Sequence, residues 1–206
     1  MQSQMPPIPH LDIPSLIHSL WTSAAQLNGL TFCRILNEAI RSDELEISSD
    51  VVSIVKGFVT LSVMSAGAGV LPSDLKVYRG GGLPDQYMPF FSVGKMYRTP
   101  MLLSTSSDWV LCQKIFCYIA QMEDRLPPVL YVVQLDGRDE YECVSSVVRP
   151  QNGMEREFVF WPYNVFEVSG VVWRERPTWQ YPHVVYVSAR GKGGAFEDDL
   201  PLAMWH

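Results

Sequence analysis

Hydrophobic residues recur every three to four positions through the first third of the chain. This spacing is typical of amphipathic helices, and it predicts one or two helices over residues 12–41 and another over 50–64. The residues on the apolar faces are Leu16, Ile17, Leu20, Phe32, Leu36 and Ile40 in the first segment, and Val51, Val55, Phe58 and Leu61 in the second. Residues 1–11 are polar and rich in proline, so we expect a flexible tail there.

Beyond residue 71 the apolar and aromatic residues gather in short runs, which favour strands. The runs lie at 75–82, 95–107, 128–135, 142–148, 155–161, 164–173 and 183–189, and a helical pattern at 108–121 interrupts them. The most apolar run, 128–135, fits the centre of a sheet. Helices first and strands afterwards indicate an α+β fold with a mixed, mainly antiparallel β core. We expect a single domain over 12–206, with a helical part at 12–70 and a β-rich part at 71–206.

Composition narrows the classes of function. The 206 residues are 47% hydrophobic and 12% aromatic, which is enough for a substantial core. The formal net charge is -6 and no run of Lys and Arg occurs, so nucleic-acid binding is not expected, because phosphate contacts need a basic face. No positive residue precedes Arg34, and polar residues interrupt 13–33, so we expect neither a secretory signal nor a membrane span. The sequence therefore predicts a cytoplasmic protein, the alternative being a secreted effector delivered by another route.

The cysteines do not form a metal-binding pattern. Cys33, Cys112, Cys117 and Cys143 include no Cys-x-x-Cys pair, and no histidine stands at zinc spacing. We therefore expect no metal site and predict reduced, buried thiols.

Two glutamates open the strand in "MEREFVFWPYNVFEV", residues 154–168. Glu155 and Glu157 share a face, because side chains alternate along a strand. Two like charges so close repel each other, so the arrangement adds no stability. One interpretation is a solvated strand end where the charges cost little. The other is a catalytic pair of carboxylates.

Two further motifs stand at predicted strand ends. Arg79 is followed by three glycines, which suits either a turn or a phosphate site in which a ligand approaches the backbone closely. The run from Ser104 to Ser106 ends a strand just before Asp108 opens a helix. Helix capping by Ser106 or Ser107 explains part of this run but does not explain the hydroxyl at Ser104.

In this order, Tyr-Arg-Gly, Ser-Thr-Ser and Glu-x-Glu resemble the arginine–serine–glutamate class of mono-ADP-ribosyltransferases, which includes cholera toxin, the clostridial binary toxins and the vertebrate ecto-transferases. "EREFVFWPYNVFEV" is similar to the glutamate strand of that family, and Gly94 falls where relatives place a glycine. "RILNEAIRS" resembles the helix before the first strand in many eukaryotic members. The resemblance spans about residues 30 to 170 and implies a two-sheet β core of the ADP-ribosyltransferase type.

The resemblance also implies the chemistry. The substrate would be NAD, and no metal would be needed. The activity would be a transfer of ADP-ribose to a protein side chain. Family members with a glutamate at the position of Glu155 usually modify arginine, so arginine is the expected acceptor. Glu157 would stabilise the oxocarbenium-like transition state, and Ser104 would orient Glu157. Glu155 would face the acceptor. The implied NAD-binding residues are Arg79, which would hold the phosphates and tie two strands together, Gly80, whose backbone would hold the nicotinamide carboxamide, and Ser104, Thr105 and Ser106.

Some alternatives stay open on the sequence alone. An NAD glycohydrolase would use water as the acceptor, and a catalytically inactive relative would only bind NAD or a protein. An aromatic residue is expected to stack on nicotinamide, and the candidates are Phe90, Phe91, Tyr97 and Phe116. The identity of the protein acceptor is not encoded in any motif.

Overall fold

The computed structural model describes residues 13–23, 26–42, 51–57, 74–135, 144–148, 156–192 and 199–203. The chain divides into two compact units, residues 1–64 and 65–206. Glu155, Cys143 and residues 58–64 of the third predicted helix lie outside the described residues.

The described part of the first unit includes helices α1 and α2 with a short hairpin between them. Helix α1 covers Ile13–Thr22 and α2 covers Phe32–Ser42, so the two-helix version of the prediction is correct, and residues 51–57 are also helical. Strands β1 (Gln26–Leu27) and β2 (Leu30–Thr31) pair antiparallel. Asn28 and Gly29 join them with φ angles of 54° and 79°. Asn-Gly is a strong signal for such a two-residue turn, and the helical spacing around it concealed the hairpin.

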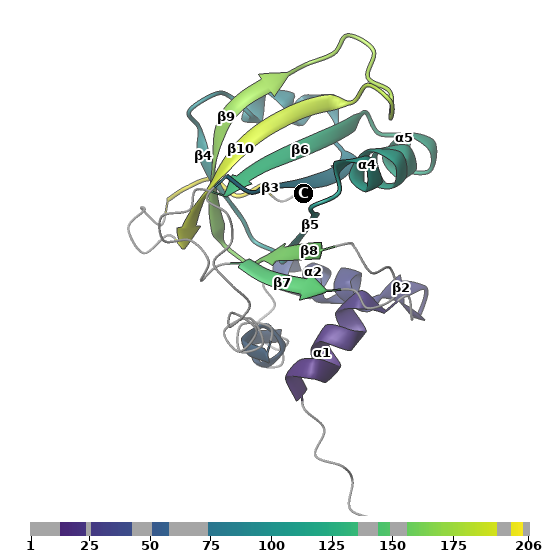
Figure 1. Ribbon diagram of the computed structural model, residues 1–206, viewed down its shortest axis with the longest axis vertical. Coiled ribbons are helices and arrows are strands. Elements are labelled where there is room, and N and C mark those ends of the chain that lie inside the picture. Colours follow the sequence, from purple (N-terminus) through teal and green to yellow (C-terminus); the bar gives the residue numbers. More distant parts are fainter. Residues whose placement is uncertain are drawn as a thin grey trace, which may run out of the picture. The chain divides into compact units, whose positions relative to one another are not determined.

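The second unit is built on an eight-stranded mixed sheet (Figure 1). The strand order is β4-β9-β10-β6-β3-β5-β8-β7, and among these described strands only β10 and β6 pair parallel. The strands are β3 (Lys76–Gly82), β4 (Met96–Thr99), β5 (Leu103–Ser106), β6 (Pro128–Leu135), β7 (Val144–Val148), β8 (Arg156–Phe160), β9 (Asn164–Val172) and β10 (His183–Lys192). The α+β class with a mainly antiparallel sheet is therefore confirmed, and the apolar run at 128–135 is an interior strand.

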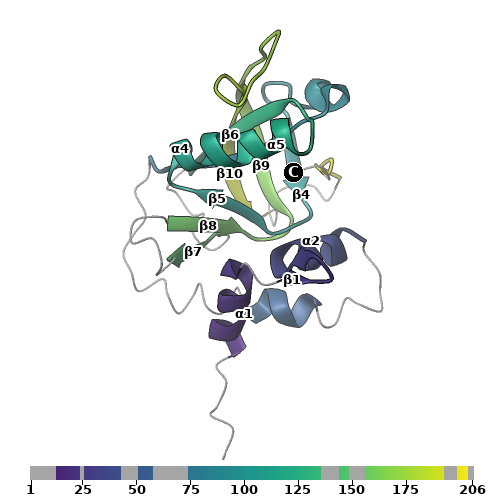
Figure 2. The same ribbon diagram turned by 90° about the vertical axis from the view of Figure 1, so that its right-hand side faces the viewer.

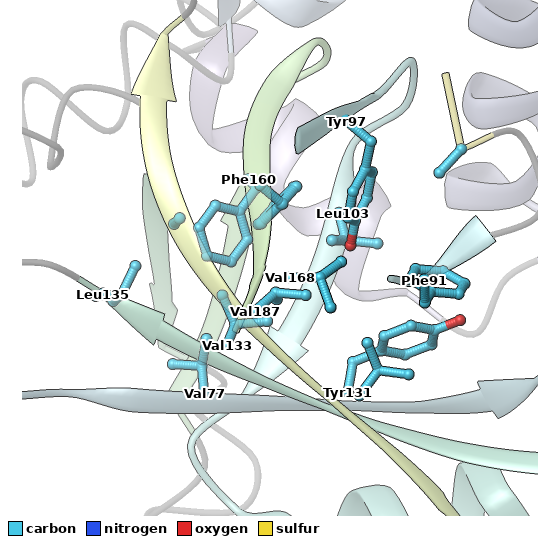
Figure 3. Close-up of a cluster of buried hydrophobic side chains, with 14 of the residues drawn as sticks. Val77, Phe91, Tyr97, Leu103, Tyr131, Val133, Leu135, Phe160, Val168 and Val187 are labelled. Atoms are coloured by element: carbon cyan, nitrogen blue, oxygen red, sulfur yellow. The ribbon is translucent and has the colours of Figure 1, made fainter. Parts of the chain in front are cut away.

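The sheet is divided into two halves that share one core. Seven residue pairs join β3 to β6, but β3 and β5 are joined in register only at Tyr78 and Ser106. Side chains from both halves pack together, and Figure 3 shows Phe160 of β8 close to Val168 and Val187 of β9 and β10. The rings of Phe160 and Phe166 meet edge to face, with centroids 5.2 Å apart. This arrangement corresponds to the two-sheet core that the resemblance implied.

Two predicted strands differ in detail from the observed ones. The run at 95–107 forms two strands, β4 at one edge of the sheet and β5 in the other half, with a break at Pro100. Proline has no N–H to donate to a ladder, which explains the break. The glycines after Arg79 do not form a turn, because Gly80, Gly81 and Gly82 all pair with β6.

One helical segment packs against β3 and β6. It comprises α4 (Trp109–Leu111), a π-helical turn η2 (Cys112–Cys117) and α5 (Tyr118–Met122), and Figure 2 shows it in front of the sheet. Asp108 caps its start by accepting hydrogen bonds from the N–H groups of Val110 and Leu111. A 3-10 helix, η1 (Asp85–Phe90), follows β3. The segment predicted at 108–121 is therefore helical, and its central turn is π rather than α.

Candidate active site

Three neighbouring strands carry the three predicted motifs. Arg79 lies on β3, Ser104 on β5 and Glu157 on β8, and these strands are consecutive in the sheet. The Arg79 Nη1 atom donates a hydrogen bond to the backbone oxygen of Ser104 over 3.0 Å. Residues 78 positions apart in sequence are thus brought to one part of the sheet, at the junction between its two halves.

The register decides which hydroxyl lies nearest to Glu157. Ser106 is the direct cross-strand partner of Glu157, whereas Ser104 is the partner of Val159. Directly opposed residues of an antiparallel pair, and residues two apart on one strand, point to the same face. Ser104, Ser106 and Glu157 therefore share one face of the sheet. Ser104 is therefore a diagonal neighbour of Glu157, and Ser106 is the residue directly opposite Glu157.

Thr105 lies on the opposite face. Its side chain is buried, and its hydroxyl donates to the backbone oxygen of Phe158 over 2.8 Å. Phe158 belongs to the main core. The structure therefore does not bring the Thr105 hydroxyl to the face that holds Ser106 and Glu157.

Arg79 reaches this region from the edge of β3. Alternation places its side chain on the other face from its neighbour Tyr78, which pairs with Ser106. However, Tyr78 and Ser106 are the last paired residues of the β3–β5 ladder. Beyond this pair the two strands diverge, and the Arg79 side chain can reach β5 directly. The guanidinium consequently contacts the main chain of Ser104 and ties the two halves of the sheet together.

Glu157 is a buried carboxylate. Its exposed fraction is 5%, and among the described residues it is the only buried Asp or Glu. Burial of a carboxylate costs free energy unless partners compensate it. The interpretation of a solvated strand end is therefore wrong for Glu157. Glu155, the other half of the pair, lies outside the described residues.

The β3–β6 ladder fixes the direction of the Gly80 backbone. Past one end of the paired residues, the N–H of Leu83 donates to the oxygen of Pro127 over 2.9 Å. At the other end, the N–H of Leu135 donates to the oxygen of Leu75 over 3.0 Å. Bonded and non-bonded pairs alternate along an antiparallel ladder, so Gly80 occupies a non-bonded position. Its N–H and C=O point away from β6, toward the side where β5 diverges.

Gly80 also meets the helical segment at close range. A Cβ atom at this position would collide with the backbone oxygen of Cys112 and would lie 2.9 Å from the Cβ of Phe116. A Cβ at Gly81 would meet nothing within 4 Å. The absence of a side chain at residue 80 therefore allows the π-helical turn to pack directly on β3.

The four aromatic residues that could stack on nicotinamide differ in how exposed their side chains are. Phe91 and Tyr97 are buried in the core, with 2% and 1% exposure. Phe90 packs edge to face on both rings, and the ammonium group of Lys95 lies 3.6 Å from its centroid. Phe116 is 45% exposed and stands beside Gly80. Of the four, Phe116 is the ring that is both accessible and next to the predicted nicotinamide position.

The thiols of the helical segment are not nucleophiles. Burial raises the pKa of Cys112 to about 12 and that of Cys117 to about 11, so both remain protonated at neutral pH. Within the described ranges, no three His, Cys, Asp or Glu side chains gather as a metal site would require. No helix in that part of the chain is long and apolar enough to cross a membrane.

Comparison of the fold with solved structures identifies the architecture. The Vis toxin of Vibrio splendidus, an ADP-ribosyltransferase, is similar with a TM-score of 0.63 and 13% identity, covering 94% of this chain and 79% of that chain. The chain has the ADP-ribosyltransferase fold. Exoenzyme S from Pseudomonas aeruginosa gives a TM-score of 0.55 at 17% identity, covering 93% and 81% of the two chains. An ADP-ribosyltransferase from Clostridium botulinum gives 0.52 at 11% identity, covering 86% and 85%.

The sequence comparisons add no further relatives. No protein-family model matches the chain, and no curated protein matches it. The ADP-ribosyltransferase fold is thus retained at 11–17% identity to the three proteins named above. At this distance the likeness concerns the fold alone.

Proposed function

We propose that the chain is a mono-ADP-ribosyltransferase that moves ADP-ribose from NAD to an arginine side chain of a protein and releases nicotinamide. The observation that carries this proposal is the placement of Arg79, Ser104 and Glu157 on three consecutive strands of an ADP-ribosyltransferase fold. The burial of Glu157 supports it, because a buried carboxylate is retained for function more readily than for stability.

The reaction breaks the bond between the nicotinamide nitrogen and ribose C1′. The electron pair of that bond leaves with nicotinamide, and positive charge develops on the ribose. Glu157 supplies a fixed negative charge to this developing cation, and burial strengthens the interaction because little water screens it. Arg79 holds the NAD phosphates with its planar guanidinium.

The backbone of Gly80 and the ring of Phe116 form the nicotinamide subsite of the proposal. The C=O of Gly80 faces the side where β5 diverges, which suits the N–H group of a carboxamide as its donor. Phe116 stands beside Gly80 and is exposed enough to stack on a flat ring.

The proposal that the acceptor is an arginine depends on Glu155. A carboxylate on the acceptor side can orient a guanidinium and take up its proton as the nitrogen attacks C1′. Vis has been solved in complex with agmatine, whose terminal group is a guanidinium, and exoenzyme S has been solved with carba-NAD. These complexes support an NAD site and a guanidinium acceptor for this chain.

Incubation with NAD and a mixture of acceptor proteins tests the proposal. We expect release of nicotinamide together with ADP-ribose adducts on arginine, located by mass spectrometry. Glu157→Gln should lower both by about 10²–10³-fold, since it removes one electrostatic stabiliser. Nicotinamide release without adducts would indicate a glycohydrolase that uses water. Absence of both, with NAD still bound, would indicate an inactive relative.

A further inference from the structure

The thiol of Cys112 contacts the single residue pair that joins the two halves of the sheet. Its sulfur donates a hydrogen bond to the backbone oxygen of Tyr78 over 3.2 Å. Tyr78 and Ser106 are the one pair in register between β3 and β5. Cys112 is 1% exposed, so this contact is shielded from water.

The sulfur also lies close to both strands at this point. The backbone N–H groups of Gly80 on β3 and Ser106 on β5 partly oppose the rise that burial causes in the pKa of Cys112. Because the pKa remains at about 12, the thiol keeps its proton and can donate it at any working pH. The carbonyl of the same residue abuts Gly80, so Cys112 meets β3 through its main chain as well.

A second contact also crosses the junction. Besides the Tyr78–Ser106 pair, the Arg79 guanidinium reaches the Ser104 backbone. The same junction sets where β3, which carries Arg79, stands relative to β5 and β8, which carry the serines and Glu157. A small displacement here moves the group that holds NAD relative to the group that stabilises the transition state.

We propose that Cys112 is a positioning residue of the active site, which holds β3 and β5 together so that Arg79 and Glu157 keep their relative geometry. This inference rests on the proposed function and extends it to a residue outside the three motifs. In the sequence, Cys112 is only a helical cysteine expected in the core, because the contact depends on where β3 and β5 diverge.

Cys117 provides a matched control one π-helical turn away. It is fully buried, and its thiol donates to the backbone oxygen of Val129 over 3.3 Å. Val129 lies on β6, where seven consecutive pairs already hold β3 in register. The two cysteines therefore share chemistry, burial and helix, and they differ in whether the carbonyl they contact belongs to the β3–β5 junction.

The test compares Cys112→Ala, Cys112→Ser, Cys117→Ala and Cys117→Ser in nicotinamide release and thermal stability. We expect Cys112→Ala to lower kcat by about tenfold or more, because ångström-scale misplacement of reacting groups is costly. Cys112→Ser keeps a donor and should recover most of that loss. Both Cys117 variants should retain kcat within about twofold even where they melt as early as the Cys112 variants. Equal losses of kcat at the two positions, or none at Cys112, would overturn the inference.

A readout that needs no activity separates this inference from the proposed function. Amide hydrogen exchange should rise in Cys112→Ala at both Tyr78 and Ser106, and in Cys117→Ala at Val129 without a rise at Ser106. If the wild-type protein releases no nicotinamide, the proposed function fails while this exchange pattern still supports the junction role. Unchanged exchange at Ser106 in Cys112→Ala would overturn the junction role whether or not the wild type is active.

Discussion

Ser106 and Glu157 are direct cross-strand neighbours on β5 and β8, and both side chains are buried. The Ser106 hydroxyl accepts a hydrogen bond from the N–H of Asp108 over 3.1 Å, which leaves its own hydrogen to donate. The resemblance assigned the orienting hydroxyl to Ser104, whose direct partner is Val159. Two serines on one face are therefore candidates for orienting the carboxylate.

We predict that Ser106→Ala lowers kcat more than Ser104→Ala does. Directly opposed side chains have Cβ atoms about 5 Å apart, whereas diagonal neighbours are roughly 7–8 Å apart, so Ser106 is the nearer donor. Ser106→Thr keeps the hydroxyl and should restore most of the rate. Nicotinamide release at saturating NAD measures the effect. A larger loss in Ser104→Ala, with Ser106→Ala close to wild type, would assign the role to Ser104 instead.

Arg79→Lys should weaken NAD binding while leaving the fold intact. Lysine keeps the charge but loses the planar fork that can grip a phosphate and reach the Ser104 carbonyl together. Loss of one charge-assisted, bidentate contact is worth about 1.5–3 kcal/mol, or roughly 10- to 150-fold in Kd. Calorimetric titration with NAD measures it, and Arg176→Lys, at an exposed loop position, is the control. Equal affinity in the two variants would remove Arg79 from the NAD site.

Gly80→Ala and Gly81→Ala should differ sharply. The added Cβ at residue 80 meets the Cys112 carbonyl, while that at residue 81 meets open space. Overpacking of this kind costs about 1–3 kcal/mol, so Gly80→Ala should lower the melting temperature and NAD affinity. Gly81→Ala should stay within about 0.5 kcal/mol of wild type in urea unfolding. A neutral Gly80→Ala would mean that the helical segment can move away from β3.

Stability should fall on acidification through His183. Burial lowers the pKa of this imidazole, and its Nδ1 accepts a hydrogen bond from the N–H of Arg174 over 3.0 Å, which requires the neutral ring. The nearby Asp85 opposes the shift and Arg174 adds to it. The unfolded chain takes up a proton near pH 6.5 and the folded chain at lower pH, so the stabilisation is complete above about 6.5 and is lost below it.

Melting temperatures at pH 7.5 and 5.5 measure this effect. The drop between the two should be larger in the wild type than in His183→Gln, which cannot titrate. Parallel drops in the two proteins would show that other groups cause the acid sensitivity.

Local sequence patterns predicted most of the helices and strands. The helical spacing around Leu36 and the apolar run at 128–135 both predicted their elements, because burial of one face imposes a period on the sequence. The break at Pro100 and the Asn28–Gly29 turn are also local features. The first divides a run that was expected to be one strand, and the second lies between the two helices that the spacing left open as one or two. The parallel pairing of β10 with β6 depends on strands far apart in sequence, so no local pattern indicates it.

The residues of the candidate site were proposed from the sequence, and their geometry was not. Arg79, Ser104 and Glu157 were found through motif order, and the structure places them on adjacent strands. Which serine opposes Glu157 depends on the register between β5 and β8, which a sequence of alternating residues leaves open by two positions. The contact of Cys112 with Tyr78 depends on the packing of a helix on a strand, which no motif records.

Glu155 and Glu157 should have separable roles. Glu157 is buried opposite Ser106, where a carboxylate can act on the ribose cation. Glu155 precedes it by two residues on the sequence, and the resemblance assigns it to the acceptor. Water needs less help than a guanidinium to capture the cation, so the two activities should depend on the two carboxylates differently.

We therefore expect Glu157→Gln to abolish arginine transfer and NAD hydrolysis together, by about 10²–10³-fold. Glu155→Gln should abolish transfer but leave much of the hydrolysis, because bond cleavage still has its stabiliser. Both activities are measured on the same preparation, with circular dichroism to confirm folding and Glu175→Gln, at an exposed loop position, as the control. Equal loss of both activities in the two variants would show that the carboxylates act as one unit. Full activity in both would mean that neither carboxylate takes part, and that the burial of Glu157 serves some purpose other than catalysis.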